Sequence, residues 1–322
     1  MTLENFILKH LRKIEQKSVK IFGINVSLCQ YTELINQKLI QNYLIRNYIK
    51  PYLNNELVHF EIKPKKDIGT DKIIWQYWGQ GIDENTSQIV KACFHSVKKY
   101  KGEYKQIILT NDTISEYIDI PNFVYNKLND GCINYTFFSD ILRFCLLIAY
   151  GGVWVDATIY LTDKINENIL NNSFFSFQRC KTAIYKNKFK NLNPEYFNWS
   201  KFWKVNWLNS FIISEKNNPL IIAILDILLN YHQNENGIKH YFLAHLIFDY
   251  LVKNTKYRKF NCKIYDDTLP HLIALFANSP YTGTLWNNII SKSSIHKLTY
   301  FKEISYNSLI EHILKVDENG KE

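Results

Sequence analysis

The chain has 322 residues, of which 46% are hydrophobic, and this is enough apolar material to bury a core in one large or two small domains. Its formal net charge of +9 favours anionic partners such as a nucleotide diphosphate, a nucleic acid or an acidic membrane face. No apolar run reaches the roughly 18 residues of a membrane helix, and the N-terminus lacks a signal peptide's apolar core and cleavage site. We therefore expect a globular cytoplasmic protein.

The six cysteines lie far apart in the chain and form neither a CxxC pair nor a His-spaced cluster. This spacing indicates neither a zinc site nor a disulfide framework, so we expect reduced and mostly buried thiols.

Residues 1–67 are predicted to form an N-terminal helical region, because apolar residues recur there at helical spacing. Basic residues between positions 9 and 20 alternate with apolar ones, which suits either a solvated helix face or contact with an anionic membrane. The segment 60–71 carries Pro, Gly and charged residues and is predicted to link this region to a domain at 68–322.

From residue 72 onward, short apolar runs alternate with helical patterns, and this predicts an α/β fold with a mainly parallel sheet flanked by helices. Ligands bind beyond the carboxyl ends of the strands in such sheets, so residues 76–79 and 110–112 are candidate site positions. The expected elements are a strand at 72–78, a helix at 87–100, a strand at 105–110 and a helix at 121–128.

The segment 139–158 reads SDILRFCLLIAYGGVWVDAT and carries the most information about chemistry. Residues 139–150 are predicted to form a helix with a broad apolar face, and the Gly151-Gly152 pair ends it. Residues 153–155 then form a short buried strand, and Asp156 stands where that strand ends.

Asp140 and Arg143 are neighbours on one side of this helix, which would bring them towards Asp156 in one pocket. Displacing a nucleotide diphosphate from a sugar develops negative charge, which an Arg, a Lys or a divalent cation must stabilise. Carboxylates hold such a cation and accept hydrogen bonds from hydroxyl groups. The structural alternative is a surface ion pair worth about 0.3–0.5 kcal/mol and an Asp in a turn.

The order S-D-x-x-R followed by G-G-V-W-V-D-A-T resembles the bacterial capsular polysaccharide synthesis glycosyltransferases, relatives of families with a DxD sugar-binding region. The resemblance extends back to KIIWQYWGQG at 72–81 and forward to SSIHKLTY at 293–300. It implies a GT-A, Rossmann-like fold and transfer of a sugar from a nucleotide-sugar donor, expected to be UDP-linked. The implied acceptor is a capsular or other cell-surface glycan, as an oligosaccharide or linked to lipid, with retention of configuration.

The resemblance also implies roles for individual residues. Gln76 and Trp78 match the place where these enzymes receive the nucleotide base. Asp140 and Arg143 match the pair that binds the donor sugar and its phosphates, and Asp156 matches the first Asp of DxD.

The expected cofactor is Mn²⁺ or Mg²⁺, with Asp156, Thr158 and His296 as its implied ligands and Lys297 on the diphosphate. Thr158 replaces the second Asp of DxD, and a hydroxyl is a poor substitute for a carboxylate around these cations. Two alternatives follow. In the first, Asp156 and His296 hold the cation together with the donor phosphates. In the second, Arg143 and Lys297 supply the positive charge in place of a cation.

Weaker signals lie further along the chain. The aromatic segment 199–211 suits either sugar stacking or a packed loop, and Tyr241, His245 and Asp249 share a helix face that suits either an acceptor site or a core. A catalytically degenerate protein that binds glycan or nucleotide remains the alternative function. Nucleic-acid binding has no supporting motif. The lack of a signal peptide or membrane helix and the basic N-terminal stretch predict a location in the cytoplasm or at the inner face of its membrane.

Overall fold

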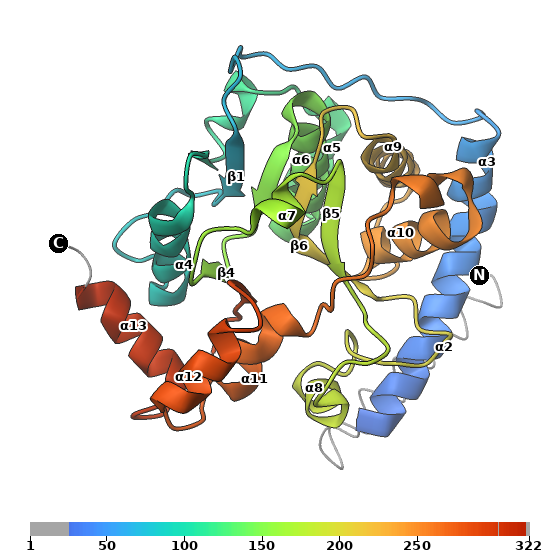
Figure 1. Cartoon of the computed structure of the whole chain (residues 1–322). Coiled ribbons are helices and arrows are strands. Elements are labelled where there is room, and N and C mark those ends of the chain that lie inside the picture. Colours follow the sequence, from blue (N-terminus) through green and yellow to red (C-terminus); the bar gives the residue numbers. More distant parts are fainter. Residues whose placement is uncertain (1–25, 302, 320–322) are drawn as a thin grey trace.

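A five-stranded sheet with the order β2-β1-β3-β6-β5 lies at the centre of the protein (Figure 1). The computed structural model describes residues 26–301 and 303–319. Strands β2, β1, β3 and β5 run in one direction and β6 runs against them, so the expected α/β class with a mostly parallel sheet is confirmed. A second sheet pairs β4 with β7 antiparallel. The strands are β1 Ile73–Tyr77, β2 Lys105–Leu109, β3 Gly152–Val155, β4 Ile159–Leu161, β5 Phe174–Gln178, β6 Trp207–Ser214 and β7 Ile295–Lys297.

Helices cover the sheet and extend beyond it, and within the described ranges none of them is both long and apolar enough to cross a membrane. The α-helices are α2 Val26–Leu44, α3 Lys50–Leu53, α4 Gln88–Tyr100, α5 Asn122–Asn129, α6 Tyr135–Tyr150, α7 Glu167–Leu170, α8 Lys186–Leu192, α9 Pro219–Asn234, α10 Leu243–Asn254, α11 Leu272–Phe276, α12 Gly283–Ile290 and α13 Leu309–Asn319. A π-helix, Ile45–Ile49, joins α2 to α3, and 3-10 turns span Ile114–Glu116, Lys256–Phe260 and Leu269–His271.

The two faces of the sheet bury different side chains, because successive residues of a strand point to opposite sides. On β1, Trp75 and Tyr77 enter the larger core, which the helices α6, α9 and α10 complete. Ile74 enters a smaller core on the other face with Val153 and Val155 of β3. Every residue of β1 is buried, as the central position of this strand requires.

Helix α2 lies along α10 at the outer edge of the protein (Figure 1). Its residues Ile40 and Leu44 are buried in the larger core, and the Gln41 side chain donates to the Leu246 carbonyl at 3.0 Å. The expected helical stripe at 34–44 is therefore present. The earlier stripe and the basic residues between 9 and 20 lie outside the described residues, and the domain division at 67 stays a prediction.

Helix α6 begins at Tyr135, earlier than the expected Ser139, because Asn134 caps it. The Asn134 side chain accepts from the amides of Thr136 at 3.0 Å and Phe137 at 3.2 Å. The helix ends where expected, at Gly151. Strand β3 follows at once, so the chain turns directly from the helix into the sheet.

The Gly151-Gly152 turn passes very close to β1. Gly152 has a φ of 97°, and a Cβ there would lie 2.6 Å from the Ile73 carbonyl oxygen. The Trp75 indole donates to the Gly151 carbonyl at 2.9 Å. Only a residue without a Cβ allows this approach, so the glycine pair sets the position of β3 and of Asp156 after it.

We expect Gly152→Ala to lower the free energy of unfolding by about 2–5 kcal/mol, through strain at positive φ and the clash with the Ile73 carbonyl. Urea unfolding followed by far-UV circular dichroism measures the change. Gly237→Ala is the matched control, since a Cβ there meets nothing within 4 Å and its φ is not positive. Equal midpoints for the two variants would show that the glycine turn is not tightly constrained.

Candidate functional site

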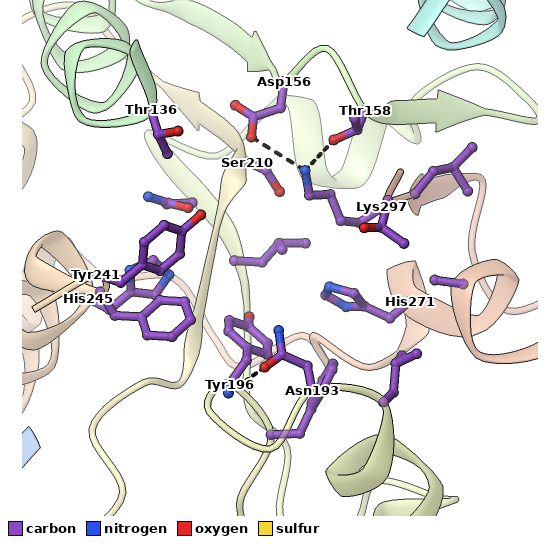
Figure 2. A pocket seen from close by; sticks show the side chains of 18 of the residues that line it. Thr136, Asp156, Thr158, Asn193, Tyr196, Ser210, Tyr241, His245, His271 and Lys297 are labelled. Atoms are coloured by element: carbon purple, nitrogen blue, oxygen red, sulfur yellow. Dashed lines mark hydrogen bonds and ion pairs between the residues drawn. The ribbon is translucent and has the colours of Figure 1, made fainter. Parts of the chain in front are cut away.

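A pocket of about 400 Å³ opens at the carboxyl end of β3, between α6, β6, β7 and the start of α10 (Figure 2). Residues predicted from the sequence contribute four charged side chains and a threonine to its wall, which together form its charged group. These are Asp140, Arg143, Asp156, Thr158 and Lys297. The structure therefore brings together most of the side chains that the segment 139–158 indicated, and adds one from a distant strand.

Arg143 connects the helix, the strand end and β6. Its side chain is only 4% exposed, and one Nη lies 3.1 Å from Asp156 and 3.2 Å from Asp140. The other Nη donates to the Asn209 carbonyl of β6 at 2.6 Å. Trp154 closes the arrangement, since its indole donates to Asp156 Oδ1 at 2.7 Å and its ring lies 5.2 Å from the guanidinium. Arg143 is thus occupied in holding two carboxylates in place.

The pKa of Asp140 is raised, although the carboxyl group lies beside an arginine. Burial raises the pKa of Asp140 from 3.8 to about 6, although Arg143 opposes the shift, and Asp156 raises this pKa further. The Asn209 side chain donates to Asp140 Oδ1 at 3.1 Å. A carboxyl with a pKa near the working pH changes its charge under mild conditions, which is common at functional sites.

Lys297 is brought to the pocket by the pairing of β7 with β4, in which Lys297 lies opposite Ile159. Its ammonium lies 3.6 Å from Asp156 Oδ2 and donates to the Thr158 hydroxyl (Figure 2). The side chain is 24% exposed, so this cation faces the pocket whereas Arg143 is enclosed.

His296 precedes Lys297 on β7 and therefore points to the other side of the strand. It is fully buried, its Nε2 lies 3.1 Å from the Thr162 hydroxyl, and burial lowers its pKa to about 3. His296 is not part of the pocket wall, so the structure does not bring it together with Asp156.

The residues at this site do not fit a divalent cation. Across residues 26–301 and 303–319, no group of three or more His, Cys, Asp or Glu residues surrounds a common position. Asp156 Oδ1 already accepts from Arg143 and Trp154. The Lys297 ammonium lies between Asp156 Oδ2 and Thr158, the two groups expected to bind the cation. A second positive charge at that position would be repelled.

Gln76 and Trp78 lie at the carboxyl end of β1, outside the pocket wall. Gln76 accepts from the Gln106 side chain at 2.6 Å, but among the described residues its own Nε2 has no acceptor. Trp78 Nε1 likewise lacks an acceptor there. Both atoms are buried, and their role with a nucleotide base stays a prediction.

The weaker signals divide between core and pocket. Trp203 and Trp207 are buried core residues, and Asp249 is 1% exposed and paired with Lys253, so packing explains them. Tyr241 and His245 line the pocket, as one of the two interpretations anticipated.

Asn209, Ser210 and His271 also line the pocket, although the sequence analysis assigned them no site role. Asn209 fell within the aromatic segment 199–211, where its amide gave a weak signal. No local pattern marks Ser210 or His271. Their positions depend on how β6 and α11 pack against distant parts of the chain.

The chain was compared with known proteins. Residues 27–313 match the model of a family described as capsular polysaccharide synthesis protein. The chain is 22% identical over 200 residues to O-glycosyltransferase braB of Annulohypoxylon truncatum. This alignment covers 58% of the chain and 44% of braB, so the chain spans less than half the length of this relative. Among solved structures, PaToxG glycosyltransferase gives a TM-score of 0.37 at 18% identity, covering 70% of this chain and 80% of that one. Because the family match extends over most of its length, this chain belongs to the capsular polysaccharide synthesis protein family.

Proposed function

We propose that this protein is a glycosyltransferase of the GT-A type that moves a hexose from a nucleotide-sugar donor, UDP-linked, to a capsular or other cell-surface glycan. The observation that carries the proposal is the pocket at the end of β3, where Arg143 holds Asp140 and Asp156 and Lys297 contacts Asp156. Membership of the capsular polysaccharide synthesis family and the similarity to an O-glycosyltransferase support it.

Lys297 is the group that we assign to the donor diphosphate. It reaches the pocket on a flexible side chain, and its contacts with Asp156 and Thr158 leave it 24% exposed. A cation aimed at the leaving phosphate stabilises the charge that develops as the glycosidic bond breaks. A divalent cation would supply the same stabilisation, but the residues present do not fit one, and no step here depends on it.

The remaining groups match the other parts of a nucleotide-sugar. Asp140 and Asp156 accept hydrogen bonds from sugar or ribose hydroxyls, since Arg143 fixes both carboxylates at the pocket wall. Gln76 Nε2 and Trp78 Nε1 are donors without acceptors, and the carbonyl oxygens of a base such as uracil would satisfy them.

In the proposed reaction the bond between the sugar C1 and the phosphate oxygen breaks, and the nucleoside diphosphate leaves with the bonding electrons. The acceptor oxygen forms the new bond on the same face, and its proton passes to the leaving phosphate oxygen. The products are a glycoside of retained configuration and a nucleoside diphosphate. This route requires no nucleophilic side chain, which agrees with the engagement of Asp156 by Arg143 and Trp154.

The proposed acceptor is an oligosaccharide or a lipid-linked glycan at the inner face of the cytoplasmic membrane. The alternative function is binding of a glycan or a nucleotide without turnover. The observation that favours it is the contact between Lys297 and Asp156, because each of these two charged groups already has a partner.

The first test is nucleotide release from a panel of UDP-, GDP- and CMP-sugars by the purified protein. We expect release from one donor class, and a loss of at least about 100-fold in Asp156→Ala because the donor's hydroxyl and phosphate groups are no longer positioned. Asp163→Ala is the control, as Asp163 is exposed and lies outside the pocket. Binding without release would favour the alternative function. The absence of both binding and release would reject both functions.

The second test concerns the positive charge. We expect the wild-type protein to bind the nucleoside diphosphate in EDTA, and Lys297→Met to weaken this binding by about 10–100-fold, the value of a charge-assisted hydrogen bond. Isothermal titration calorimetry gives the affinities. Lys164→Met removes the same charge from an exposed position and serves as the control. Wild-type binding that requires Mn²⁺ would instead support the metal that the family resemblance implies.

The third test is the pH dependence of kcat/KM for the donor. Because burial raises the pKa of Asp140 to about 6, this carboxyl is charged above that pH and becomes neutral below it. We expect kcat/KM to fall about tenfold per pH unit below 6. The pKa values of His245 and His271, about 3 and 4, are too low to produce this limb. A limb near pH 4, or one that persists in Asp140→Asn, would contradict the assignment.

A further inference from the structure

The pocket has an uncharged half that the proposed chemistry leaves unexplained. Figure 2 shows Tyr241 and His245 on one side of the pocket and His271 on the other, with Ser210 beside the charged group. Ser210 and His245 are 2% and 6% exposed. Ser210 Oγ and His245 Nδ1 nevertheless have no hydrogen-bond partner in the part of the chain that the structure describes. Buried polar atoms without partners cost stability, so two of them in one pocket wall point to a ligand that satisfies them.

A hydrogen bond to the backbone decides which ring nitrogen of His271 accepts. For His245, Nδ1 is the nitrogen without a hydrogen-bond partner among the described residues. His271 Nδ1 lies 2.7 Å from the Asp267 carbonyl and must donate to it, which leaves Nε2 as the acceptor. Burial lowers the pKa of His245 to about 3 and the pKa of His271 to about 4, so both rings are neutral at ordinary pH.

We propose that Ser210, His245 and His271 form a subsite for a sugar ring, whose hydroxyl groups donate to His271 Nε2 and bond with His245 Nδ1 and Ser210 Oγ. Neutral acceptors of this kind suit hydroxyl groups and do not attract a phosphate. Tyr241 adds an aromatic ring that is 59% exposed at the pocket wall, and such rings pack against the C–H face of sugars.

This inference rests on the proposed function, because it assumes that a sugar is a substrate. The ring bound there has two sources with the same hydroxyl chemistry, the sugar of the donor and the sugar of the acceptor. The arms of the experiment separate them.

The sharpest variant is Ser210→Ala, because it removes an unpartnered hydroxyl. Because this substitution removes no hydrogen bond from the free protein, the unfolding midpoint of Ser210→Ala should equal or exceed that of the wild type. Ser214→Ala is the matched control on the same strand, where the buried hydroxyl donates to the Glu215 carbonyl at 2.9 Å. That control should lower the midpoint and leave sugar binding unchanged.

Sugar binding is measured by saturation-transfer NMR with the methyl glycosides of glucose, galactose, mannose and N-acetylglucosamine. We expect at least one to bind the wild type and Ser214→Ala, with the signal reduced several-fold in Ser210→Ala and in His271→Phe. If UDP-sugar displaces the methyl glycoside and UDP does not, the subsite binds the donor's ring. If the methyl glycoside stays bound in the presence of either one, the subsite binds the acceptor's ring.

Two results would overturn the subsite. One is the absence of binding by every glycoside, and the other is an equal signal in the wild type, Ser210→Ala and His271→Phe. Nucleotide release is measured on the same preparations. If no donor releases its nucleotide while a methyl glycoside still binds in a manner that depends on Ser210, the transferase proposal fails and the subsite stands.

Discussion

The buried guanidinium of Arg143 is the interaction on which the site depends. It joins α6 to the end of β3 through Asp156 and to β6 through the Asn209 carbonyl, and it also contacts Asp140 on its own helix. Removing one partner of such a buried network leaves the other charges without compensation, which costs far more than a surface ion pair. The network therefore stabilises the contact between helix and sheet and at the same time fixes two carboxylates at the wall of the pocket.

The second constraint is the pairing of β7 with β4. It places a residue more than a hundred positions along the chain beside Thr158, and strand alternation then directs Lys297 into the pocket and His296 away from it. Thr158 offers a hydroxyl and no carboxylate beside Asp156. The ammonium of Lys297 contacts both side chains, which disfavours a divalent cation at the same position.

The pocket combines two environments within about 400 Å³. One part carries the charges held by Arg143, with the unpartnered hydroxyl of Ser210 beside them, and the other part carries neutral imidazoles. Functional sites commonly contain polar groups that bond to a ligand and not to one another, which lowers the stability of the free protein. The proposed nucleotide-sugar donor has the corresponding two parts, an anionic diphosphate and a hydroxyl-rich ring.

The sequence by itself determined the α/β class, the helix and glycine turn before Asp156 and the pairing of Asp140 with Arg143, because helical and strand periodicities are local properties. It indicated Lys297 only through the family resemblance, and it could not determine that Ser210 and His271 complete the pocket. Ser210 enters through its position on β6 and Lys297 through its side of β7, and both depend on pairing between strands far apart in the chain. Such pairing is decided by the packing of the whole core, which no local pattern records.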